Sequence, residues 1–255
     1  RRENCYLQGS PQRTKRISLA EYNQKLDTYH RCIGLYKMKY LLCDLDGTIC
    51  ESKKEIEQDM LLELARLSKK YGIIIVSGAE YSRMLIQAPL KYKTFMSQNG
   101  NETYENDKLL WVNKFNDKEI VMQHITQVAT EMRTIIGDDM IDDRGSQISF
   151  SFIGHHAPLE IKKKFDPDRK IRHDLLEKYP FKGAVIGGTT CIDYIPHTKG
   201  ENIQRYLELK DIKPHECLYI GDAFMNYGND ATVLGVMPVH QITSPLETLN
   251  FIKNL

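Results

Sequence analysis

The sequence predicts an α/β protein in which a parallel sheet is interrupted by a smaller, inserted α+β domain, and two observations carry this prediction. At both ends of the 255-residue chain, short and almost entirely apolar segments alternate with amphipathic segments of helical period. This pattern is typical of parallel strands covered by helices on both faces. In the middle of the chain apolar and polar residues alternate instead, as in antiparallel strands with one solvated face. With 41% hydrophobic residues, the chain has ample material for a buried core.

The first part of the core is predicted from five segments that follow one another closely. Tyr40–Cys43 is a short apolar run typical of a buried strand, and Gly72–Val76 is a second one. Between them, residues 56–71 place apolar side chains every three or four positions, which predicts an amphipathic helix. A helix over 80–87 and a short strand over 94–96 follow. This order of strand, helix and strand indicates a parallel, Rossmann-like sheet.

The pattern changes after residue 100. Two short β segments flank Asn106-Asp107, which predicts a hairpin, although this dipeptide is a weaker turn signal than Asn-Gly. Further on, helices enclose a strand of alternating polarity. The expected elements are strands at 102–105 and 109–112, a helix at 118–136, a strand at 147–153 and a helix at 167–179. We therefore expect residues 101–189 to form a cap domain inserted into the core.

The parallel pattern returns in the last quarter of the chain. An alternating strand at 189–195 still has the pattern of the insert, and the elements expected after it are a helix at 199–209, a buried strand at 217–220 and a last strand at 236–239. The core is thus predicted to comprise residues 38–100 and 190–255. Residues 1–37 are interpreted separately, because Met38 leads directly into the first strand. They are predicted to be an N-terminal extension, either a tag or linker or the tail of an upstream segment, in which residues 17–29 have the pattern of a short helix.

The composition excludes several classes of partner. With 35 basic and 34 acidic residues, the net charge is +1, so no overall field draws the chain to nucleic acid or to an anionic membrane. The basic run Lys162–Lys164 has acidic residues close by, which favours a solvated helix face over a nucleic-acid site. Six scattered cysteines without a Cys-x-x-Cys pair fit a reducing compartment, and no apolar stretch reaches 18 residues. We expect a cytoplasmic protein without nucleic-acid or membrane partners; a homodimer is left open.

The most informative motif directly follows the first strand. Asp44 and Asp46 are two residues apart, and Gly47 comes next. Side chains two apart on a strand project in the same direction, and a glycine permits a sharp turn out of the sheet. The two carboxylates are therefore expected to share one small site. A plain strand followed by an Asp-Gly turn would explain Asp46 and Gly47 but not Asp44.

Polar residues follow three further predicted elements. Ser77-Gly78 ends the second strand, Lys199-Gly200 begins a helix, and Gly221-Asp222 ends a strand whose following loop carries Asn229-Asp230. In open α/β sheets, ligands bind outside the carboxyl ends of the strands, so these groups are expected to converge with Asp44. Taken alone, each of these dipeptides is most often part of an ordinary turn or a helix cap. Their order and strand context together point to a site.

These residue types suit phosphoryl transfer. Asp44 can attack phosphorus to give an aspartyl-phosphate, and Asp46 can protonate the leaving oxygen and later deprotonate a water molecule. A shared site separates the pKa values of two carboxyl groups, as this division of roles requires. Phosphate oxygens are expected to bind four groups: the Ser77 hydroxyl, the Gly78 N–H, the Lys199 ammonium and Asn229.

The acids also predict a metal site. Mg²⁺ prefers hard oxygen ligands and keeps near-octahedral geometry. The expected ligands are Asp44, the main-chain carbonyl of Asp46, Asp222 and Asp230. The ion would screen these carboxylates from an incoming phosphate and orient it.

On these motifs the chain resembles the haloacid dehalogenase-like superfamily of phosphohydrolases. The resemblance extends over residues 39–255 and implies a Rossmann-like core. A cap between the second and third motifs is similar to the family's C2 type, and its mixed α+β pattern to the C2B variety. The matching motifs, in order, are Asp44–Thr48, Ser77, Lys199, and Asp222 with Asp230.

Within the superfamily, the pattern is most similar to eukaryotic-type phosphomannomutases. Asp222 and Asp230 are eight residues apart, whereas many C2B phosphatases separate these acids by four. Other similar segments are Gln98–Gly100, Arg144-Gly145, Ile153-Gly154, Ile186–Gly188 and Ile192–Pro196. The resemblance implies that Arg144, His155 and Asp193 contact substrate from the cap.

The chain also departs from the mutases. His155 stands where they have an arginine, and Gly137–Asp139 lies where another is expected. Because a mostly neutral histidine and two acids bind a distal phosphate poorly, transfer to water is favoured. We therefore expect a Mg²⁺-dependent phosphatase acting on a small phosphorylated metabolite, with a sugar phosphate as the expected class. The alternatives are a phosphomannomutase-like phosphohexomutase and a catalytically silent binding module on the same fold.

Overall fold

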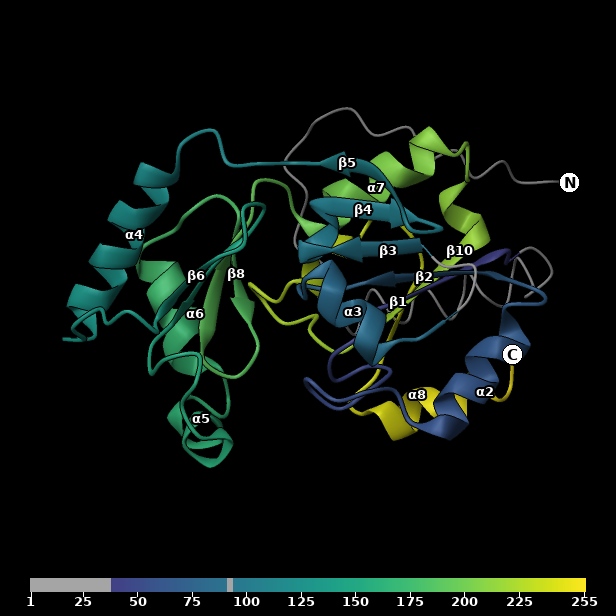
Figure 1. Ribbon diagram of the computed structural model, residues 1–255, viewed down its shortest axis with the longest axis horizontal. Helices are drawn as coiled ribbons and strands as arrows, with labels where there is room; N and C mark the ends of the chain where they lie inside the picture. Colours follow the sequence, from purple (N-terminus) through teal and green to yellow (C-terminus); the bar gives the residue numbers. More distant parts are fainter. Residues whose placement is uncertain (1–37, 91–93) are drawn as a thin grey trace, which may run out of the picture. The chain divides into compact units, whose positions relative to one another are not determined.

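The computed structural model describes residues 38–90 and 94–255, and it contains two separate sheets. The expected extension over 1–37, with its helix at 17–29, lies outside the described residues. The larger sheet has seven strands in the order β11-β10-β1-β2-β3-β4-β5, and the smaller has four in the order β6-β7-β9-β8 (Figure 1). The predicted α/β class, with a mainly parallel core sheet and a smaller α+β insertion, is confirmed.

Five strands of the larger sheet are parallel, as the apolar segments predict. Every neighbouring pair among them runs in the same direction. These strands are β1 (Tyr40–Cys43), β2 (Gly72–Val76), β3 (Thr94–Ser97), β10 (Cys217–Gly221) and β11 (Val239–Gln241). Because β1 lies between β10 and β2, the carboxyl ends of these three strands are adjacent at one edge of the sheet.

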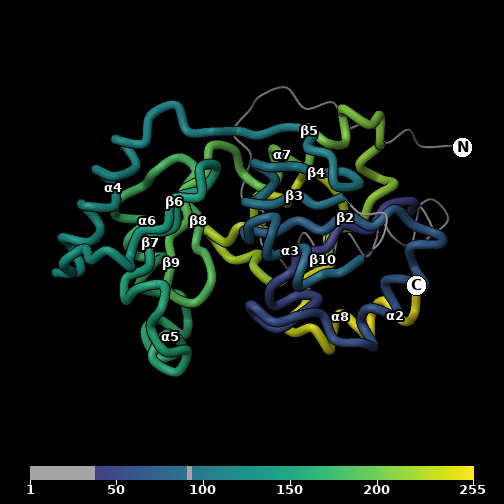
Figure 2. Tube along the Cα trace, viewed as in Figure 1, coloured from purple at the N-terminus to yellow at the C-terminus, as the bar shows by residue number. Residues whose placement is uncertain are grey.

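Helices bury both faces of this sheet. The face that carries Leu41 and Cys43 packs against apolar side chains of α2 (Gln58–Leu67), α3 (Tyr81–Gln87) and α8 (Pro245–Ile252). The opposite face is covered by α7 (Lys199–Leu209), whose Tyr206 hydroxyl reaches Thr94 of β3 at 3.2 Å. Figure 2 traces the same arrangement along the chain. Burying successive strand residues on opposite faces explains why the core segments are apolar at every position.

The start of α7 is fixed by its own sequence. Thr198 accepts a hydrogen bond from the N–H of Glu201, and the Glu201 carboxylate accepts one from the N–H of Thr198. This reciprocal capping box stabilises the first helical turn. Gly200 packs so closely on the main chain that a Cβ there would collide with the carbonyl oxygen of Thr232. Lys199 therefore starts a helix that is locked against the segment carrying Asp230.

The predicted hairpin belongs to the core sheet and not to the cap. Strands β4 (Glu102–Glu105) and β5 (Lys108–Val112) continue the large sheet antiparallel to β3. The reason is that the chain reverses directly after β3 through η2 (Gln98–Gly100), where Asn99 is left-handed. Trp111 anchors the hairpin, because its Nε1 donates to the Gly100 carbonyl at 3.0 Å.

The smaller sheet is antiparallel and takes up one strand that was assigned to the core. Its pairings are β6–β7, β7–β9 and β8–β9. The elements of this part are α4 (Lys118–Glu131), β6 (Ile141–Asp143), β7 (Ile148–Ser151), α5 (Leu159–Phe165), α6 (Lys170–Lys178), β8 (Ala184–Gly187) and β9 (Cys191–Tyr194). The expected boundaries at 101 and 189 thus differ from the strand pairing. We propose residues 114–195 as the limits of this unit, and call it the insert.

One face of the insert sheet is apolar and the other polar, but the polar face is not solvated as expected. Phe150 and Ile192 pack with α4 and α6 in a second apolar cluster. On the opposite face, Ser149, Ser151 and Asp193 are at most 8% exposed. They are buried because this face is turned toward core residues, with which Ser149 and Asp193 line one cavity.

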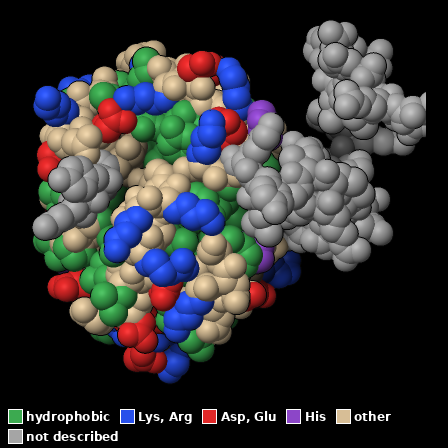
Figure 3. All heavy atoms as spheres, turned by 90° about the vertical axis from the view of Figure 1, so that its right-hand side faces the viewer, with side chains coloured by type: hydrophobic (Ala, Val, Ile, Leu, Met, Phe, Trp, Pro, Cys, Tyr) green, Lys and Arg blue, Asp and Glu red, His purple; other side chains and the backbone are tan. Residues whose placement is uncertain are grey.

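The last part of the core is more irregular than predicted. The strand expected at 236–239 begins only at Val239, because Val236 closes a turn on Val233 and Pro238 has no N–H to donate to a neighbouring strand. Short helical turns η3 (Pro214–Glu216) and η4 (Asp230–Val233) flank β10. Within the described part of the chain, no helix is both long and apolar enough to cross a membrane. On the face drawn in Figure 3, basic and acidic side chains are interspersed, which agrees with the near-neutral composition.

Candidate active site

The strand ends predicted to converge do so around a cavity of about 220 Å³. Asp44 follows β1, Ser77 follows β2 and Asp222 follows β10, so the sheet order brings them together. The insert supplies the facing wall of the cavity. The cavity-lining residues include Asp44, Asp46, Ser77, Gly78, Asp222 and Asn229 from the core, and Arg144, His155 and Asp193 from the insert. All nine are candidate site residues predicted from the sequence.

Lys199 lies behind this cavity, fully buried. Its ammonium donates to Asp44 Oδ1 at 2.8 Å, Asp230 Oδ1 at 2.6 Å and the Tyr219 hydroxyl at 3.0 Å. Burial lowers the pKa of Lys199, but the carboxylates of Asp230 and Asp44 more than offset this effect and hold the pKa above its ordinary value. Lys199 is therefore a fixed positive charge in contact with Asp44.

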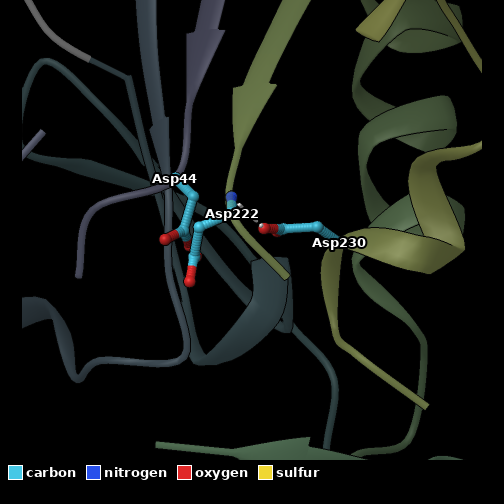
Figure 4. A group of neighbouring side chains, drawn as sticks. All are labelled: Asp44, Asp222 and Asp230. Atoms are coloured by element: carbon cyan, nitrogen blue, oxygen red, sulfur yellow. Dashed lines mark hydrogen bonds between the residues drawn. The ribbon is translucent and has the colours of Figure 1, made fainter. Parts of the chain in front are cut away.

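Asp230 organises the residues around it. One of its oxygens accepts from Lys199 and from the Tyr219 hydroxyl at 2.6 Å. The other accepts from the main-chain N–H groups of Asp222 at 3.1 Å and Ala223 at 2.9 Å. Figure 4 shows Asp230 approaching from the side of η4 toward the main chain of Asp222. The carboxylate of Asp230 thus ties the loop after β10 to Lys199.

Asp44 and Asp222 extend side by side from their strand ends (Figure 4). Burial raises the pKa of Asp44 well above its usual range; Lys199 opposes this, and Asp230 and Asp222 add to it. Burial and the neighbouring Asp230 also raise the pKa of Asp222. Ionised together, the three carboxylates would carry more negative charge than Lys199 balances, which is why their ionisation is opposed.

This surplus charge fits a divalent cation. Asp44, Asp222 and Asp230 can each offer one oxygen, and these three atoms lie within 4.8 Å of one another. Carboxylate oxygens are the donors that Mg²⁺ and similar hard ions prefer. Asp230 differs from the other two acids, because each of its two oxygens already accepts two hydrogen bonds. Asp44 and Asp222 are thus better placed as direct ligands, with Asp230 holding them in place.

Asp46 is engaged by residues that sequence reasoning missed. Its Oδ2 is 3.0 Å from Arg83, and its Oδ1 accepts from Gln87 at 3.1 Å and from the N–H of Lys53 at 2.6 Å. Arg83 and Gln87 are four residues apart on α3, the helix that follows Ser77-Gly78. Their four-residue spacing places both side chains on one face of a predicted helix, which was the only sequence signal for this contact. It was not sufficient, because most charged residues on helices are exposed to solvent.

The predicted phosphate-binding residues are held by a network that crosses from the core to the insert. The Ser77 hydroxyl accepts from the Ala79 N–H at 3.0 Å. Asn229 donates to the Asn99 side chain at 3.2 Å, and Asn99 donates to Gln147 of the insert at 3.0 Å. Asn99 belongs to the segment Gln98–Gly100, noted in the sequence only for its resemblance to the mutases.

The three insert residues expected to contact substrate also have protein partners. Arg144 donates to Asp142 at 2.8 Å and to the Gly78 carbonyl at 3.2 Å. Asp193 accepts from the Ser149 hydroxyl at 2.5 Å, and its burial raises its pKa above the usual value. The Nε2 of His155 lies 3.1 Å from the Ser149 carbonyl.

Two further cations line the cavity and were not predicted. Lys53, from the loop after the first motif, is exposed but lies in a basic neighbourhood: partial desolvation of its ammonium, followed by the charges of Lys162, Arg83 and Arg144, lowers its pKa. Arg169, from the turn before α6, lies 3.6 Å from Asp222. Arg169 lies shortly after the basic run Lys162–Lys164, whose sequence surroundings favour a solvated face.

Comparison with known proteins identifies the family. The family model of haloacid dehalogenase-like hydrolases matches residues 41–182, more than half of the chain, and the chain belongs to this family. The resemblance predicted from the motifs is therefore confirmed.

Curated relatives of low sequence identity agree with this assignment. The phosphomannomutase of Spinacia oleracea is 26% identical over 233 residues, covering 82% of this chain and 92% of the relative. The phosphomannomutase of Saccharomyces cerevisiae is 25% identical over 241 residues, covering 84% and 93%. Among solved structures, the N-terminally truncated, IMP-bound IMP-nucleotidase of Plasmodium falciparum shares the fold, with a TM-score of 0.61 and 16% identity over 92% of this chain and 80% of that one.

Proposed function

We propose that the protein is a Mg²⁺-dependent phosphatase that hydrolyses a small phosphorylated metabolite through an aspartyl-phosphate on Asp44. The observation that carries this proposal is the buried Lys199, held between Asp44 and Asp230 at a cavity lined by the other predicted motifs. A fixed ammonium beside a nucleophilic carboxylate stabilises the charge of a phosphoryl group in transfer.

In the first half-reaction, the Asp44 carboxylate attacks phosphorus and the bond to the leaving oxygen breaks. Asp46 donates a proton to that oxygen. In the second, Asp46 takes a proton from water, whose oxygen attacks phosphorus and frees Asp44 as phosphate departs. Lys199, Ser77 and the Gly78 N–H stabilise the phosphoryl oxygens.

Asp46 is held by Arg83 in this structure, so its proton transfer requires a change of partner. The cavity lies between Asp46 and the insert residues, which suggests that bound substrate draws Asp46 from Arg83 toward the leaving oxygen. Arg83 is therefore proposed as the residue that positions Asp46 between turnovers.

The donor set supports a resident Mg²⁺. Asp44, Asp222 and the main-chain carbonyl of Asp46 are proposed as its protein ligands, and Asp230 as the residue that fixes Asp222. When bound, the ion would neutralise the two carboxylates and favour approach of the anionic substrate.

The substrate class is proposed from the walls of the cavity. Arg144, Lys53 and Asp193 supply charged and hydrogen-bonding groups to these walls. Such walls favour a small, hydroxyl-rich phosphate ester, and a sugar phosphate fits this description.

A phosphohexomutase is the second candidate. It is favoured by the phosphomannomutases among the relatives and by the eight-residue separation of Asp222 and Asp230. A mutase would use the same nucleophile but return the phosphoryl group to a second sugar oxygen. A silent binding module is less well supported, because the acids and Lys199 retain contacts suited to catalysis.

One experiment separates these functions. The protein is incubated with Mg²⁺ and a panel of sugar phosphates, with and without a hexose bisphosphate, and both inorganic phosphate and isomer exchange are followed. Phosphate release that Asp44→Asn abolishes, and that the exposed Asp59→Asn leaves unchanged, is expected. Exchange without net release would replace the phosphatase by the mutase, and no turnover on the whole panel would favour the binding module.

A further inference from the structure

Three arginines line the cavity, and they differ in how fully their donors are engaged. Arg83 donates to Gln87 at 3.0 Å and to Asp46 at 3.0 Å. Arg144 donates to Asp142 and to the Gly78 carbonyl. Both guanidinium groups are thus held by well-formed hydrogen bonds to the protein.

Arg169 has no such partner among the described residues. Its nearest carboxylate oxygen, on Asp222, is 3.6 Å away, beyond the usual 2.7–2.9 Å of a charge-assisted hydrogen bond. Among the described residues, the one hydrogen bond made by its guanidinium is a weak contact with the sulfur of Met225 at 3.7 Å. The side chain is nevertheless only 28% exposed. A largely buried guanidinium with unengaged donors, facing a cavity, is suited to an anion.

The buried carboxylate of Asp166 stabilises the turn that carries Arg169. The Asp166 carboxylate accepts from the N–H groups of Ile171 and Arg172 at 3.0 and 3.2 Å, and pairs with the fully buried Arg172 side chain. Arg169 has a left-handed backbone, with φ of +61°. A residue other than glycine adopts this conformation only where its surroundings determine it. The turn thus holds Arg169 toward Asp222 in a defined way.

The neighbours of Arg169 identify the anion. Asp222 belongs to the same cluster as Asp44, whose oxygen lies within 4.8 Å of that of Asp222. An anion that reaches Arg169 from the cavity is therefore next to the proposed nucleophile. The planar fork of a guanidinium matches two oxygens of one phosphoryl group.

We propose that Arg169 is the insert's ligand for the phosphoryl group that is transferred to Asp44, a role that rests on the phosphatase function proposed above. Lys199 supports this group with its charge from behind Asp44 on the core side, and Arg169 contacts it from the insert side. Because Arg169 belongs to the insert, the phosphoryl group gains its second cation only while insert and core face each other across the cavity.

The test measures binding of inorganic phosphate to the Mg²⁺-loaded full chain by calorimetry. The main variant is Arg169→Asn, because asparagine tolerates a left-handed backbone and keeps the turn. We expect it to weaken phosphate binding about 10- to 100-fold, the range for losing hydrogen bonds to a charged group. Arg169→Lys should recover part of the affinity, since it keeps the charge without the fork.

The matched control is Lys170→Gln. Lys170 is the next cation along the chain, but it is 68% exposed and pairs with Asp174 on its own helix. We expect its loss to change phosphate affinity by less than about threefold, as for an exposed charge. Mn²⁺ affinity, measured by electron paramagnetic resonance, should not weaken in Arg169→Asn, because Asp222 only loses a neighbouring cation.

Two results would overturn the inference. Unchanged phosphate affinity with tighter Mn²⁺ binding in Arg169→Asn would reduce Arg169 to an ion partner of Asp222. Equal losses in Arg169→Asn and Lys170→Gln would mean that only general charge matters. Failure of the phosphatase function is seen in a different assay: the substrate panel would then show isomer exchange without net release, or no turnover, whereas the affinity for inorganic phosphate is measured without any substrate.

Discussion

The hydroxyl of Tyr219 offers a sharp test of how the site is held together. It is fully buried, donates to Asp230 at 2.6 Å and accepts from Lys199 at 3.0 Å. Tyr219→Phe removes only this oxygen and keeps the ring, so no cavity of consequence is created. One N–H donor of Lys199 and one acceptor site of Asp230 then lose their hydrogen-bond partner inside a fully buried part of the protein.

The expected cost follows from these two contacts. The lost bond to a charged carboxylate is worth about 1.5–3 kcal/mol, and an unsatisfied buried donor costs about 1–3 kcal/mol. Removing a polar hydroxyl from the interior returns part of this. We therefore expect Tyr219→Phe to lower the free energy of unfolding by about 2–4 kcal/mol.

The assay is urea unfolding followed by circular dichroism, with Tyr179→Phe as the matched control. The Tyr179 hydroxyl also donates to a carboxylate, that of Glu131 at 2.7 Å, but at an exposed site. Its loss should cost less than about 1 kcal/mol. Equal effects of the two substitutions would refute the argument that burial makes the Tyr219 contacts strong.

Three further changes test other parts of the structure. Gly187→Ala places a Cβ against the Asp193 carboxylate, so we expect a raised KM with little change in the free energy of unfolding. The control is Gly137→Ala, whose added Cβ meets nothing within 4 Å and should leave KM unchanged in steady-state assays. Arg172→Met leaves a buried carboxylate unpaired and should cost about 3–5 kcal/mol in urea unfolding, where a cost below 1 kcal/mol would contradict the pairing. Burial lowers the pKa of His124, so the unfolded chain binds more protons than the folded one and stability is lost as the pH falls below about 6.5. We measure the free energy of unfolding between pH 7 and pH 5 in the wild type and in His124→Gln. The loss should be steeper in the wild type, by at most about 1.4 kcal/mol per pH unit.

The core could be predicted well because its signals are local. Tyr40–Cys43, Gly72–Val76 and Lys199–Leu209 have the expected bounds, since apolar runs and a capping box define them within a few residues. The hairpin Glu102–Val112 was wrongly given to the cap, because its alternation fits either sheet. Only the reversal after β3, through the left-handed Asn99, decides which sheet it joins.

The candidate site shows the same division. Motifs at strand ends could be found because the ends of neighbouring parallel strands meet at one edge. Arg83 and Arg169 could not, because each is a charged helix or turn residue whose position depends on tertiary contacts. Ser149 was expected on a solvated face, and only the packing of insert on core buries it, whereas Asp193 was predicted as a site residue from the resemblance alone.

The placement of cations bears on the choice between water and a sugar oxygen as acceptor. A mutase must hold a second phosphate on its insert while the bisphosphorylated intermediate turns over, which requires a cation with unengaged donors away from the nucleophile. Among the described insert residues that line the cavity, Arg144 is held by Asp142 and the Gly78 carbonyl, whereas Arg169 faces Asp222, close to Asp44. The Nε2 of His155 is also engaged by the protein, at 3.1 Å from the Ser149 carbonyl. An insert whose available arginine faces the nucleophile supports capture of one phosphoryl group and its transfer to water.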